Sequence, residues 1–429
     1  MKSYDAIVVG AGPAGVTAAL RMAQSGLQVL VFERADAPGA KNMFGGMLPC
    51  CPVLERLIPG IWNQAPWERH VVKRVLTLAT ETSATSLAFE SRNFDQPPYN
   101  GYTLLRPAFD HWYAEKARAA GVTLIPGCRV DGLTMNGKRV TGVRVGKGQV
   151  QAPVVLLCDG VLSLLASRAG MRTPPKASAV ALGVKGLFHL PEKEINDRFQ
   201  LVRRQGATQE FLGCTEGIRG GGFIYTQTET LSVGVVFHLD SLKQQGSAAH
   251  EMFQRFLASD AVRKILRGAR LLEYSAHLLP ESRARTLPPL FSDGVLLAGD
   301  AAGLCYTNGL NQEGMNLAIT SGFHAAETAV QAHQTGDFTA RQLAQYELRL
   351  KDSFVLKDMK TFDPAINLMQ TDRLFTVYPR LIGSIMEQVF RSDGKPKKSF
   401  GRIGWSTALE SLTVRQLIFD LIQGGRSLL

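Results

Sequence analysis

The sequence of 429 residues has no apolar run long enough to cross a bilayer. A transmembrane helix needs about 18 or more consecutive apolar residues, so we expect none. A secretory signal is also absent, because the apolar run at residues 6–9 is shorter than the roughly 7–15 residues of a signal's hydrophobic region. These absences predict a cytoplasmic protein.

Cysteine is scarce as well. The six cysteines are Cys50, Cys51, Cys128, Cys158, Cys214 and Cys305. None is spaced as CxxC, which argues against a zinc site, an iron–sulfur cluster and a disulfide framework, so we expect no metal. The adjacent Cys50 and Cys51 could form a redox pair, but neighbouring cysteines bridge only through a strained ring, which favours two reduced thiols.

Acidic residues are outnumbered, because 37 Asp and Glu face 48 Lys and Arg and leave a net charge of +11. This balance favours anionic partners such as acidic proteins, anionic lipid or nucleic acid. No nucleic-acid-binding motif accompanies it, so we expect no nucleic acid partner. The remaining composition, 45% hydrophobic and 20% charged, is typical of a globular enzyme. The length predicts two packed domains.

The N-terminal segment carries a dinucleotide-binding pattern. Residues 4–9 form a short apolar strand, followed by the GxGxxG motif of residues 10–15 (Gly-Ala-Gly-Pro-Ala-Gly) and a helical pattern over residues 16–25. A second strand over residues 27–32 ends at Glu33. This order of strand, loop, helix and strand predicts a Rossmann-type unit.

Each residue of the motif has a physical role. Gly10 permits the tight turn, Gly12 lets the backbone approach a pyrophosphate, and Gly15 brings the helix against the sheet. The helix N-terminus offers free amides and the positive end of the helix dipole to the phosphates. Glu33 can accept hydrogen bonds from the adenosine ribose. Arg34 can cover the adenine, although a solvated surface arginine explains it equally well.

A later turn distinguishes FAD from NAD. The apolar strand at residues 294–298 leads into Gly299 and Asp300, and a glycine-rich stretch then reaches Gly314 and Met315. An aspartate after a buried strand can hold the ribityl hydroxyls of FAD. The backbone amides of the turn can meet the pyrimidine edge of the flavin, and the positive helix end stabilises the anionic reduced flavin.

Two further segments support a cofactor site. Arg106 opens a helix with proline in its first turn, which suits an anion site and predicts contact with the pyrophosphate or adenine side of FAD; the alternative is an arginine that caps a surface helix. The strand at residues 122–130 follows, and the backbone of Val130 is placed to meet the adenine. Another buried strand, residues 154–158, ends at Asp159, where strand ends face the ligand.

Taken together, these motifs resemble a flavoprotein superfamily that includes aromatic hydroxylases, geranylgeranyl reductases and electron-transfer-flavoprotein:quinone oxidoreductases (ETF-QO). Residues 39–46 (GAKNMFGG), 159–166 (DGVLSLLA) and 273–280 (EYSAHLLP) resemble the ETF-QO family, and its bacterial FixC-type members above all. The resemblance covers nearly the whole chain. It implies a bound FAD that accepts electrons from an electron-transfer flavoprotein and passes them toward quinone.

One feature departs from the larger family members. Those carry a C-terminal iron–sulfur domain with four cysteines, whereas no cysteine follows Cys305 here. FixC-type members lack that domain too, and the resemblance implies a separate small ferredoxin-like protein as the next carrier. Two alternatives stay open: an NAD(P)H-dependent prenyl reductase or hydroxylase on the same fold, and a binding protein with a structural flavin. Since the flavin carries the chemistry, we name no catalytic side chain.

The middle of the chain changes pattern. Short alternating segments at residues 222–225 and 231–237 predict an antiparallel sheet over the reactive face of the flavin. The glycines at 220–222 would permit close backbone approach to a ligand, or form a mobile turn. His238 and His277 fit structural roles better than acid–base catalysis.

The C-terminal region is basic and amphipathic. From residue 373 onward there are nine Lys and Arg, including Lys395, Lys397 and Lys398, against four Asp and Glu, with apolar residues between them. Such a segment can lie on an anionic membrane. It can also pack on the body of the protein or bind an acidic ferredoxin.

These patterns predict an α/β fold in which a Rossmann-type FAD-binding domain is interleaved with an antiparallel-sheet substrate domain and a helical C-terminal region. The expected limits are 1–175 and 286–335 for the two parts of the FAD-binding domain, 176–285 for the sheet domain that receives substrate or acceptor, and 336–429 for the helical region. The residues expected to bind FAD are Gly10, Gly12, Ala14, Gly15, Glu33, Arg34, Gly45, Gly46, Arg106, Val130, Asp159, Gly299, Asp300, Gly314 and Met315.

Overall fold

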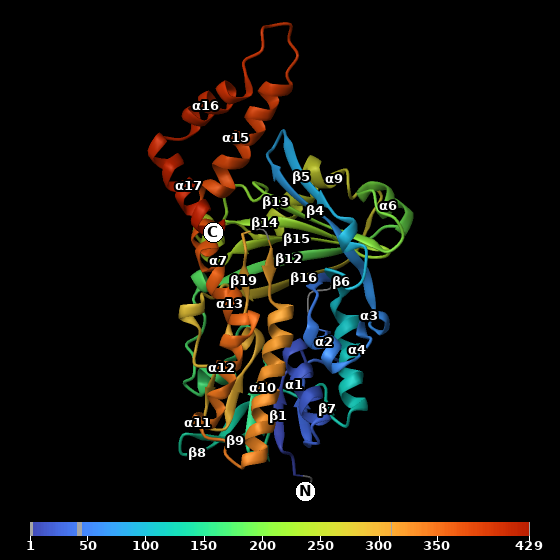
Figure 1. Ribbon diagram of the computed structural model, residues 1–429, viewed down its shortest axis with the longest axis vertical. Coiled ribbons are helices and arrows are strands. Elements are labelled where there is room, and N and C mark those ends of the chain that lie inside the picture. Colours follow the sequence, from blue (N-terminus) through green and yellow to red (C-terminus); the bar gives the residue numbers. More distant parts are fainter. Residues whose placement is uncertain (1–2, 41–44, 310, 429) are drawn as a thin grey trace.

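The chain forms an elongated molecule (Figure 1). The computed structural model describes residues 3–40, 45–309 and 311–428. A six-stranded sheet lies at the end that holds the N-terminus, a nine-stranded sheet occupies the middle, and helices α15 to α17 project at the opposite end.

The six-stranded sheet has the strand order β17-β18-β11-β1-β2-β7. Its strands are β1 (Ala6–Val9), β2 (Val29–Phe32), β7 (Thr123–Ile125), β11 (Val154–Leu157), β17 (Phe291–Ser292) and β18 (Val295–Leu297). All neighbouring pairs are parallel except β17 with β18. From β1 the chain moves outward in opposite directions to β2 and to β11, and a crevice for ligands forms at such a switch point.

Two helices that are distant in sequence cover this sheet together. Helix α1 (Pro13–Gln24) packs against α10 (Met315–Thr335). The contact is so close that a Cβ atom on Gly322 would overlap the backbone carbonyl of Ala14. Helix α4 (Arg106–Ala119) lies on the other side of α1, where the Thr17 hydroxyl and the Tyr113 hydroxyl are 2.8 Å apart.

The nine-stranded sheet joins strands from two regions of the sequence. Its strands are β3 (Gly45–Pro49), β4 (Trp67–Ala79), β5 (Ala84–Glu90), β6 (Gly101–Leu105), β12 (Val180–His189), β13 (Gln205–Leu212), β14 (Gly220–Thr226), β15 (Thr230–His238) and β16 (Arg270–Pro280). Every pairing is antiparallel except that of β13 with β4. Strands β3 to β6 therefore join the sheet from a part of the sequence N-terminal to the range 176–285.

The glycines at 220–222 lie within β14 and serve packing. A Cβ on Gly222 would overlap the ring of Phe256 from α8 (Ala249–Ala258), and one on Gly220 would overlap the carbonyl of Val236. The expected mobile turn is therefore wrong for these glycines. They make room for a helix and a neighbouring strand.

Shorter elements complete the fold. The remaining helices before residue 300 are α2 (Pro52–Leu57), α3 (Ile61–Gln64), α5 (Leu164–Arg168), α6 (Glu192–Phe199), α7 (Leu239–Gln245) and α9 (Asp260–Arg263). A three-stranded sheet consists of β8 (Gly132–Asn136), β9 (Arg139–Val145) and β10 (Gly148–Gln151), and a small ribbon of β19 (Tyr306–Thr307) and β20 (Gln312–Glu313).

The C-terminal region is helical, as expected. Its helices are α11 (Ala340–Leu343), α12 (Gln345–Asp352), α13 (Phe354–Thr361), α14 (Asp363–Met369), α15 (Arg373–Phe390), α16 (Phe400–Ser411) and α17 (Val414–Leu428). Arg373 and Tyr378 of α15 both donate to the Asp420 carboxylate of α17, with Arg373 Nε 2.7 Å and Tyr378 Oη 2.8 Å from Oδ2. Among the described residues, no helix is both long and apolar enough to span a bilayer.

The α/β fold with a Rossmann-type part and a helical C-terminus is confirmed. One strand is shorter than expected, because β7 ends at Ile125 instead of continuing to residue 130. Pro126 has no amide hydrogen for a sheet, and Gly127 has φ +65°, so the chain turns there.

Candidate functional site

The GxGxxG loop has the geometry that a phosphate cradle needs. Gly10 has φ +101° and packs so tightly on the Cys158 carbonyl that a side chain would overlap it, and a Cβ on Gly15 would overlap the carbonyl of Gly10. By contrast, a Cβ on Gly12 would meet no atom within 4 Å. Among the described residues no side chain caps the N-terminus of α1, so its amides face an open space.

Glu33 is tied to this loop. Its Oε2 accepts a 2.8 Å hydrogen bond from the Ala11 backbone N–H, and its Oε1 accepts one of 2.8 Å from the Ala35 N–H. Each carboxylate oxygen keeps a further lone pair for a ligand. Arg34 is exposed beside it.

The second predicted segment meets the first. Gly299 begins the 3₁₀ turn of residues 299–302 with φ +63°, and a Cβ there would lie 3.0 Å from the Cβ of Ala14. Burial raises the pKa of the neighbouring Asp300 to about 6, against the opposing effect of Arg106. Met315 is the first residue of α10, and among the described side chains none caps that helix at Gly314. The fold thus brings together the loop at residues 10–15, the turn at residues 299–302 and the start of α10.

Arg106 stands at the start of α4 as an ion pair. Its Nη2 lies 2.8 Å from Oδ2 of Asp110, and its Nε 3.0 Å from Oδ1. Burial opposes the charge of Arg106, but Asp110 outweighs it and raises the pKa of Arg106.

Gly45 and Gly46 lie on β3; a Cβ on Gly45 would overlap the Ser232 hydroxyl, whereas one on Gly46 would meet nothing within 4 Å.

The last two predicted residues lie at the ends of their segments. Val130 is buried beyond the end of β7. Asp159 follows β11, and its Oδ1 accepts a 2.7 Å hydrogen bond from the Ser163 hydroxyl; burial raises its pKa. Residues 41–44, part of the stretch that resembles the ETF-QO family, lie outside the described residues.

A buried cation lies beside the predicted site. Lys185 of β12 is 3% exposed, donates to the Gly45 carbonyl, and lies 5.7 Å from the ring centre of Phe223. Burial, with the nearby charge of Arg106, lowers its pKa to about 7. On β16, burial and the charges of Arg106, Arg34 and Lys185 lower the pKa of His277 to about 4. Arg106 and the protonated form of Lys185 give the crevice positive charge, whereas His277 is neutral at neutral pH.

A pocket opens between the nine-stranded sheet, including its strand β3, and the ribbon before α10. Among its lining residues are Met47, Arg74, Glu210, Tyr225, Asn311 and Glu313. Its lining residue Met47 directly follows Gly46 in the sequence, and its lining residue Glu313 directly precedes Gly314. Two of the predicted cofactor segments therefore border the pocket. Burial raises the pKa of Glu210 to about 7, against the effect of Arg74.

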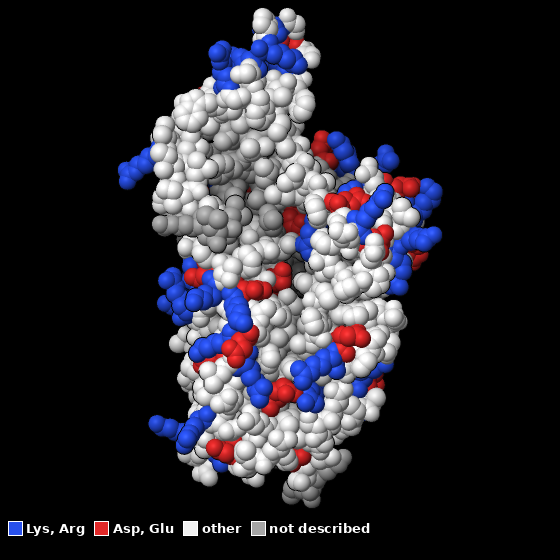
Figure 2. Space-filling view, in the orientation of Figure 1, with Lys and Arg blue, Asp and Glu red and all other residues white. Residues whose placement is uncertain are grey.

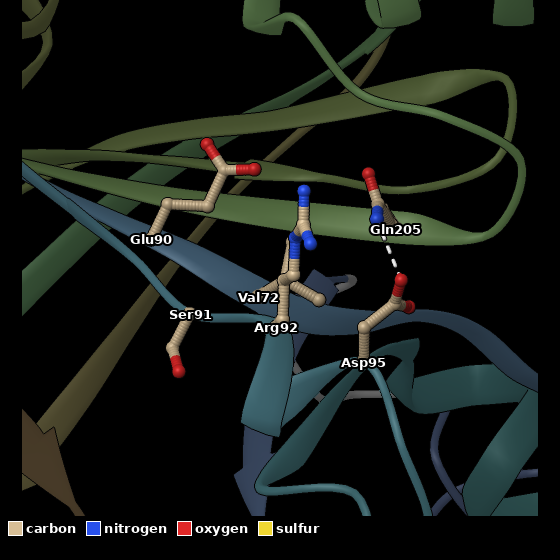
Figure 3. Close-up of a pocket in the computed structure, with 6 residues that line it drawn as sticks. All are labelled: Val72, Glu90, Ser91, Arg92, Asp95 and Gln205. Carbon is tan, nitrogen blue, oxygen red and sulfur yellow. Dashed lines mark hydrogen bonds between the residues drawn. The ribbon is translucent and has the colours of Figure 1, made fainter.

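A separate hollow lies away from these segments (Figure 3). It is lined by Val72, Glu90, Ser91, Arg92, Asp95 and Gln205. Gln205 Nε2 donates to Asp95 Oδ2 across it at 2.8 Å. None of the residues predicted to bind FAD lines this hollow, so it plays no part in the candidate site.

All six cysteines are free. Burial raises the pKa of Cys50 and of Cys51, so both are protonated thiols at neutral pH. In the ranges described, no group of three or more His, Cys, Asp or Glu side chains is placed to hold a metal ion.

Known families match most of the chain in three stretches. The FAD dependent oxidoreductase model matches residues 5–173, the ubiquinone-binding model of ETF-QO residues 180–279, and the model of the ETF-QO/FixC family C-terminal domain residues 365–429. The "Probable electron transfer flavoprotein-quinone oxidoreductase YdiS" of Escherichia coli (strain K12) is 41% identical over 99% of both chains. Protein FixC of the same strain is 42% identical over 91% of both chains.

The chain belongs to the ETF-QO/FixC family. The resemblance found in the sequence is thereby confirmed. This ETF-QO/FixC protein is an FAD-dependent oxidoreductase.

Solved structures agree on the fold of this ETF-QO/FixC chain. A geranylgeranyl bacteriochlorophyll reductase-like protein from Thermoplasma acidophilum has a TM-score of 0.73 at 19% identity and covers 98% of this chain and 99% of its own. The myxobacterial chondrochloren halogenase CndH has a TM-score of 0.65 at 18% identity, over 95% and 97% of the two chains. At such identities the likeness shows the fold alone.

The crevice of this ETF-QO/FixC chain suits FAD. The open space at Gly12 and the uncapped N-terminus of α1 accept a phosphate group. Lys185 is a buried ammonium whose pKa no acidic side chain among the described residues raises. A buried cation without an anion is costly, and an anionic cofactor would supply that anion.

Sequence reasoning missed Lys185, Arg74 and Glu210. The available signal for Lys185 was a single charged residue within the otherwise apolar run of residues 180–188. Arg74 and Glu210 had no such signal, because their neighbours come from strands that pair over more than a hundred residues.

Proposed function

We propose that this chain accepts electrons from an electron-transfer flavoprotein on its FAD and passes them toward quinone. The observation that carries the proposal is the position of the pocket beside Gly46 and Gly314. It lies between two predicted cofactor segments, and its wall includes β13 and β14, within the residues 180–279 that match the ubiquinone-binding model. The names of YdiS and of that model support the donor and the acceptor.

The predicted residues would divide the work of holding FAD. The loop at Gly10, Gly12 and Gly15 would hold the pyrophosphate, with Ala14 packed beneath it, and Glu33 would hold the adenosine ribose. The other contacts would come from Arg34, Gly45, Gly46, Arg106, Val130, Asp159, Gly299, Asp300, Gly314 and Met315. When bound, FAD supplies the two-electron redox chemistry, and the positive field of Lys185 and Arg106 stabilises negative charge on it.

The proposed division of labour follows the expected limits. Residues 1–175 and 286–335 would bind the cofactor, residues 176–285 would bind the acceptor together with β3 and β4 of the same sheet, and residues 336–429 would form the surface for a membrane or partner. A separate small ferredoxin-like protein would carry electrons from the FAD to quinone by a second route, beside the direct reduction of quinone at this chain.

The membrane surface that we propose is the projecting end of the molecule. On α16, Trp405 and Leu409 are exposed four residues apart, and on α17 Ile418, Leu421 and Ile422 are exposed on one side of the helix. Lys and Arg gather at the tip, over the loop between α15 and α16 (Figure 2). Apolar faces beside basic residues suit an anionic lipid surface.

Stopped-flow spectroscopy of the full-length, FAD-loaded protein tests the function. Reduced electron-transfer flavoprotein should reduce the FAD after mixing and so bleach its absorbance. A soluble ubiquinone analogue should then oxidise the FAD and restore the absorbance. NADH and NADPH alone should leave the flavin oxidised. Rapid bleaching by a nicotinamide nucleotide would instead identify a self-contained reductase or hydroxylase and overturn the proposal.

A further inference from the structure

Two carboxyl groups, those of Glu210 and Glu313, line the pocket beside the predicted flavin segments, and Glu210 is set among polar partners. Glu210 lies on β13 and Arg74 on the neighbouring β4. With its amide oriented to suit both, Asn311 donates to Glu210 Oε1 at 3.1 Å and accepts from Arg74 Nη1 at 2.5 Å. The other Arg74 nitrogen, Nη2, lies 3.5 Å from the sulfur of Met47. Asn311 therefore bridges the carboxyl group to the guanidinium.

The sheet register points Glu210 to the same face as the buried cation. Glu210 is paired with Phe223 on β14, which is paired with Gly234 on β15, and Gly234 is paired with Lys185 on β12. Paired residues in a sheet project to the same face. Since Lys185 contacts the carbonyl of Gly45 at the predicted cofactor site, Glu210 and Lys185 flank that site from one surface.

The groups around Glu210 leave it able to hold a proton. From β4 it faces the Arg74 guanidinium, from β14 the phenol of Tyr225, and from β20 the carboxylate of Glu313. Burial raises the pKa of Glu210 to about 7, with Arg74 opposing, and burial also raises the pKa of Tyr225. Near neutral pH, Glu210 can thus both release and regain a proton.

We propose that Glu210 donates a proton to the quinone as it is reduced at the mouth of this pocket, whose interior of about 30 Å³ admits a water-sized molecule but no quinone ring. The inference rests on the proposed function, because quinone, the acceptor proposed there, takes up two protons with its two electrons. When bound and reduced, FAD would supply two electrons and one proton. The second proton comes from Glu210: its carboxyl O–H bond breaks, an O–H bond forms on a quinone oxygen, and quinol leaves. The Glu210 carboxylate then regains a proton from water through the open pocket.

The sign of the pH dependence follows from the acid role. Only protonated Glu210 can donate, so quinone reduction should slow as the pH rises through about 7. A ferric complex such as ferricyanide takes one electron and no proton. The rate at which the reduced protein reduces ferricyanide should therefore not fall as the pH rises through about 7.

The test compares the full-length, FAD-loaded protein with its Glu210→Gln variant. Each is reduced anaerobically and mixed either with a short-chain ubiquinone analogue or with ferricyanide, from pH 5.5 to 8.5. In the variant, quinone reduction should slow by about 100-fold at pH 6 and lose its fall near pH 7, in the range of general acid catalysis. Ferricyanide reduction should stay unchanged. Glu229→Gln removes an exposed carboxylate from the turn after β14 and should behave as the unmodified protein.

Infrared spectroscopy gives a readout that does not depend on turnover. The carbonyl band of a protonated carboxylic acid should titrate near pH 7 in the unmodified protein and be missing in Glu210→Gln. If that variant fails to bind FAD, Glu210→Asp keeps an acid in the pocket and should retain both the band and the pH dependence.

Two outcomes distinguish a failure of the role proposed for Glu210 from a failure of the proposed function. Quinone reduction by Glu210→Gln at the full rate, with its pH dependence intact, would overturn the role of Glu210 and leave the proposed function standing. If the unmodified protein reduces ferricyanide but no quinone analogue at any pH, the proposed function fails, and the role of Glu210 fails with it.

Discussion

The carboxylate of Glu33 accepts a 2.8 Å hydrogen bond from the backbone N–H of Ala11. The residue at the end of β2 thus fixes the loop that follows β1. A group proposed to bind the ribose therefore also shapes the phosphate loop, and both effects act on the same cofactor.

Glu33→Ala should weaken FAD binding by about 1–3 kcal/mol, the usual cost of a lost charge-assisted hydrogen bond. That corresponds to a dissociation constant about 5 to 150 times larger. Reconstitution of the apoprotein, followed by flavin fluorescence, measures it. Asp36→Ala, which removes an exposed carboxylate three residues away, should leave the affinity unchanged. Equal affinity in the Glu33 variant would remove this residue from the site.

Lys185→Met should make the flavin reduction potential more negative by about 30–60 mV, or roughly 1.4–2.8 kcal/mol for two electrons. The loss of a buried positive charge destabilises the anionic reduced flavin. The difference should be larger at pH 6 than at pH 9, because Lys185 loses its charge as the pH rises. Titration with redox dyes measures the potential. Lys193→Met, which removes an exposed lysine on α6, is the control. A shift of the same size in its reduction potential would show that the effect does not depend on the distance of the lysine from the flavin.

Gly322→Ala should lower the free energy of unfolding by about 1–3 kcal/mol, the typical cost of overpacking. The added methyl group would overlap the Ala14 carbonyl and force α1 and α10 apart. Gly404→Ala in α16, where a Cβ meets nothing within 4 Å, should be neutral or stabilise by up to about 1 kcal/mol. Urea denaturation of the two variants decides whether close helix contact, and not glycine itself, is required.

Removing the apolar face of α16 should abolish binding to vesicles that contain anionic lipid. Trp405 is 60% and Leu409 43% exposed, and each would bury apolar area in the membrane interface. Flotation of the Trp405→Ser, Leu409→Ser double variant should leave it with the soluble fraction. Leu348→Ser, at an exposed leucine of α12, should float as the unmodified protein does. If the double variant floats with the vesicles, the membrane contact lies outside the apolar face of α16.

The sequence predicted the Rossmann-type part well because its signals are local. The apolar strands, the loop at Gly10 and the turn at Asp300 each lie within a dozen residues, and their positions follow from strand order. The identification of FAD also held, since the turn at Asp300 added evidence that the glycine loop alone lacks.

The acceptor side was harder to predict because its geometry depends on long-range pairing. Lys185 and Glu210 face one surface only through a register that runs across β12 to β15. The glycines at 220–222 were misread because their neighbours are distant in sequence; the ring that requires Gly222, Phe256, belongs to a helix some thirty residues later. Neither relationship is visible in a short stretch of sequence.

The interleaved strand order has a consequence for biosynthesis. Strand β1 is made first, yet its sheet is completed only when β18 is added beside β11, and α1 is covered only when α10 arrives. A ribosome must therefore produce more than 300 residues before the crevice can close on FAD. Until then the glycine loop lies in an unfinished sheet, so the chain can enclose FAD only late in its synthesis.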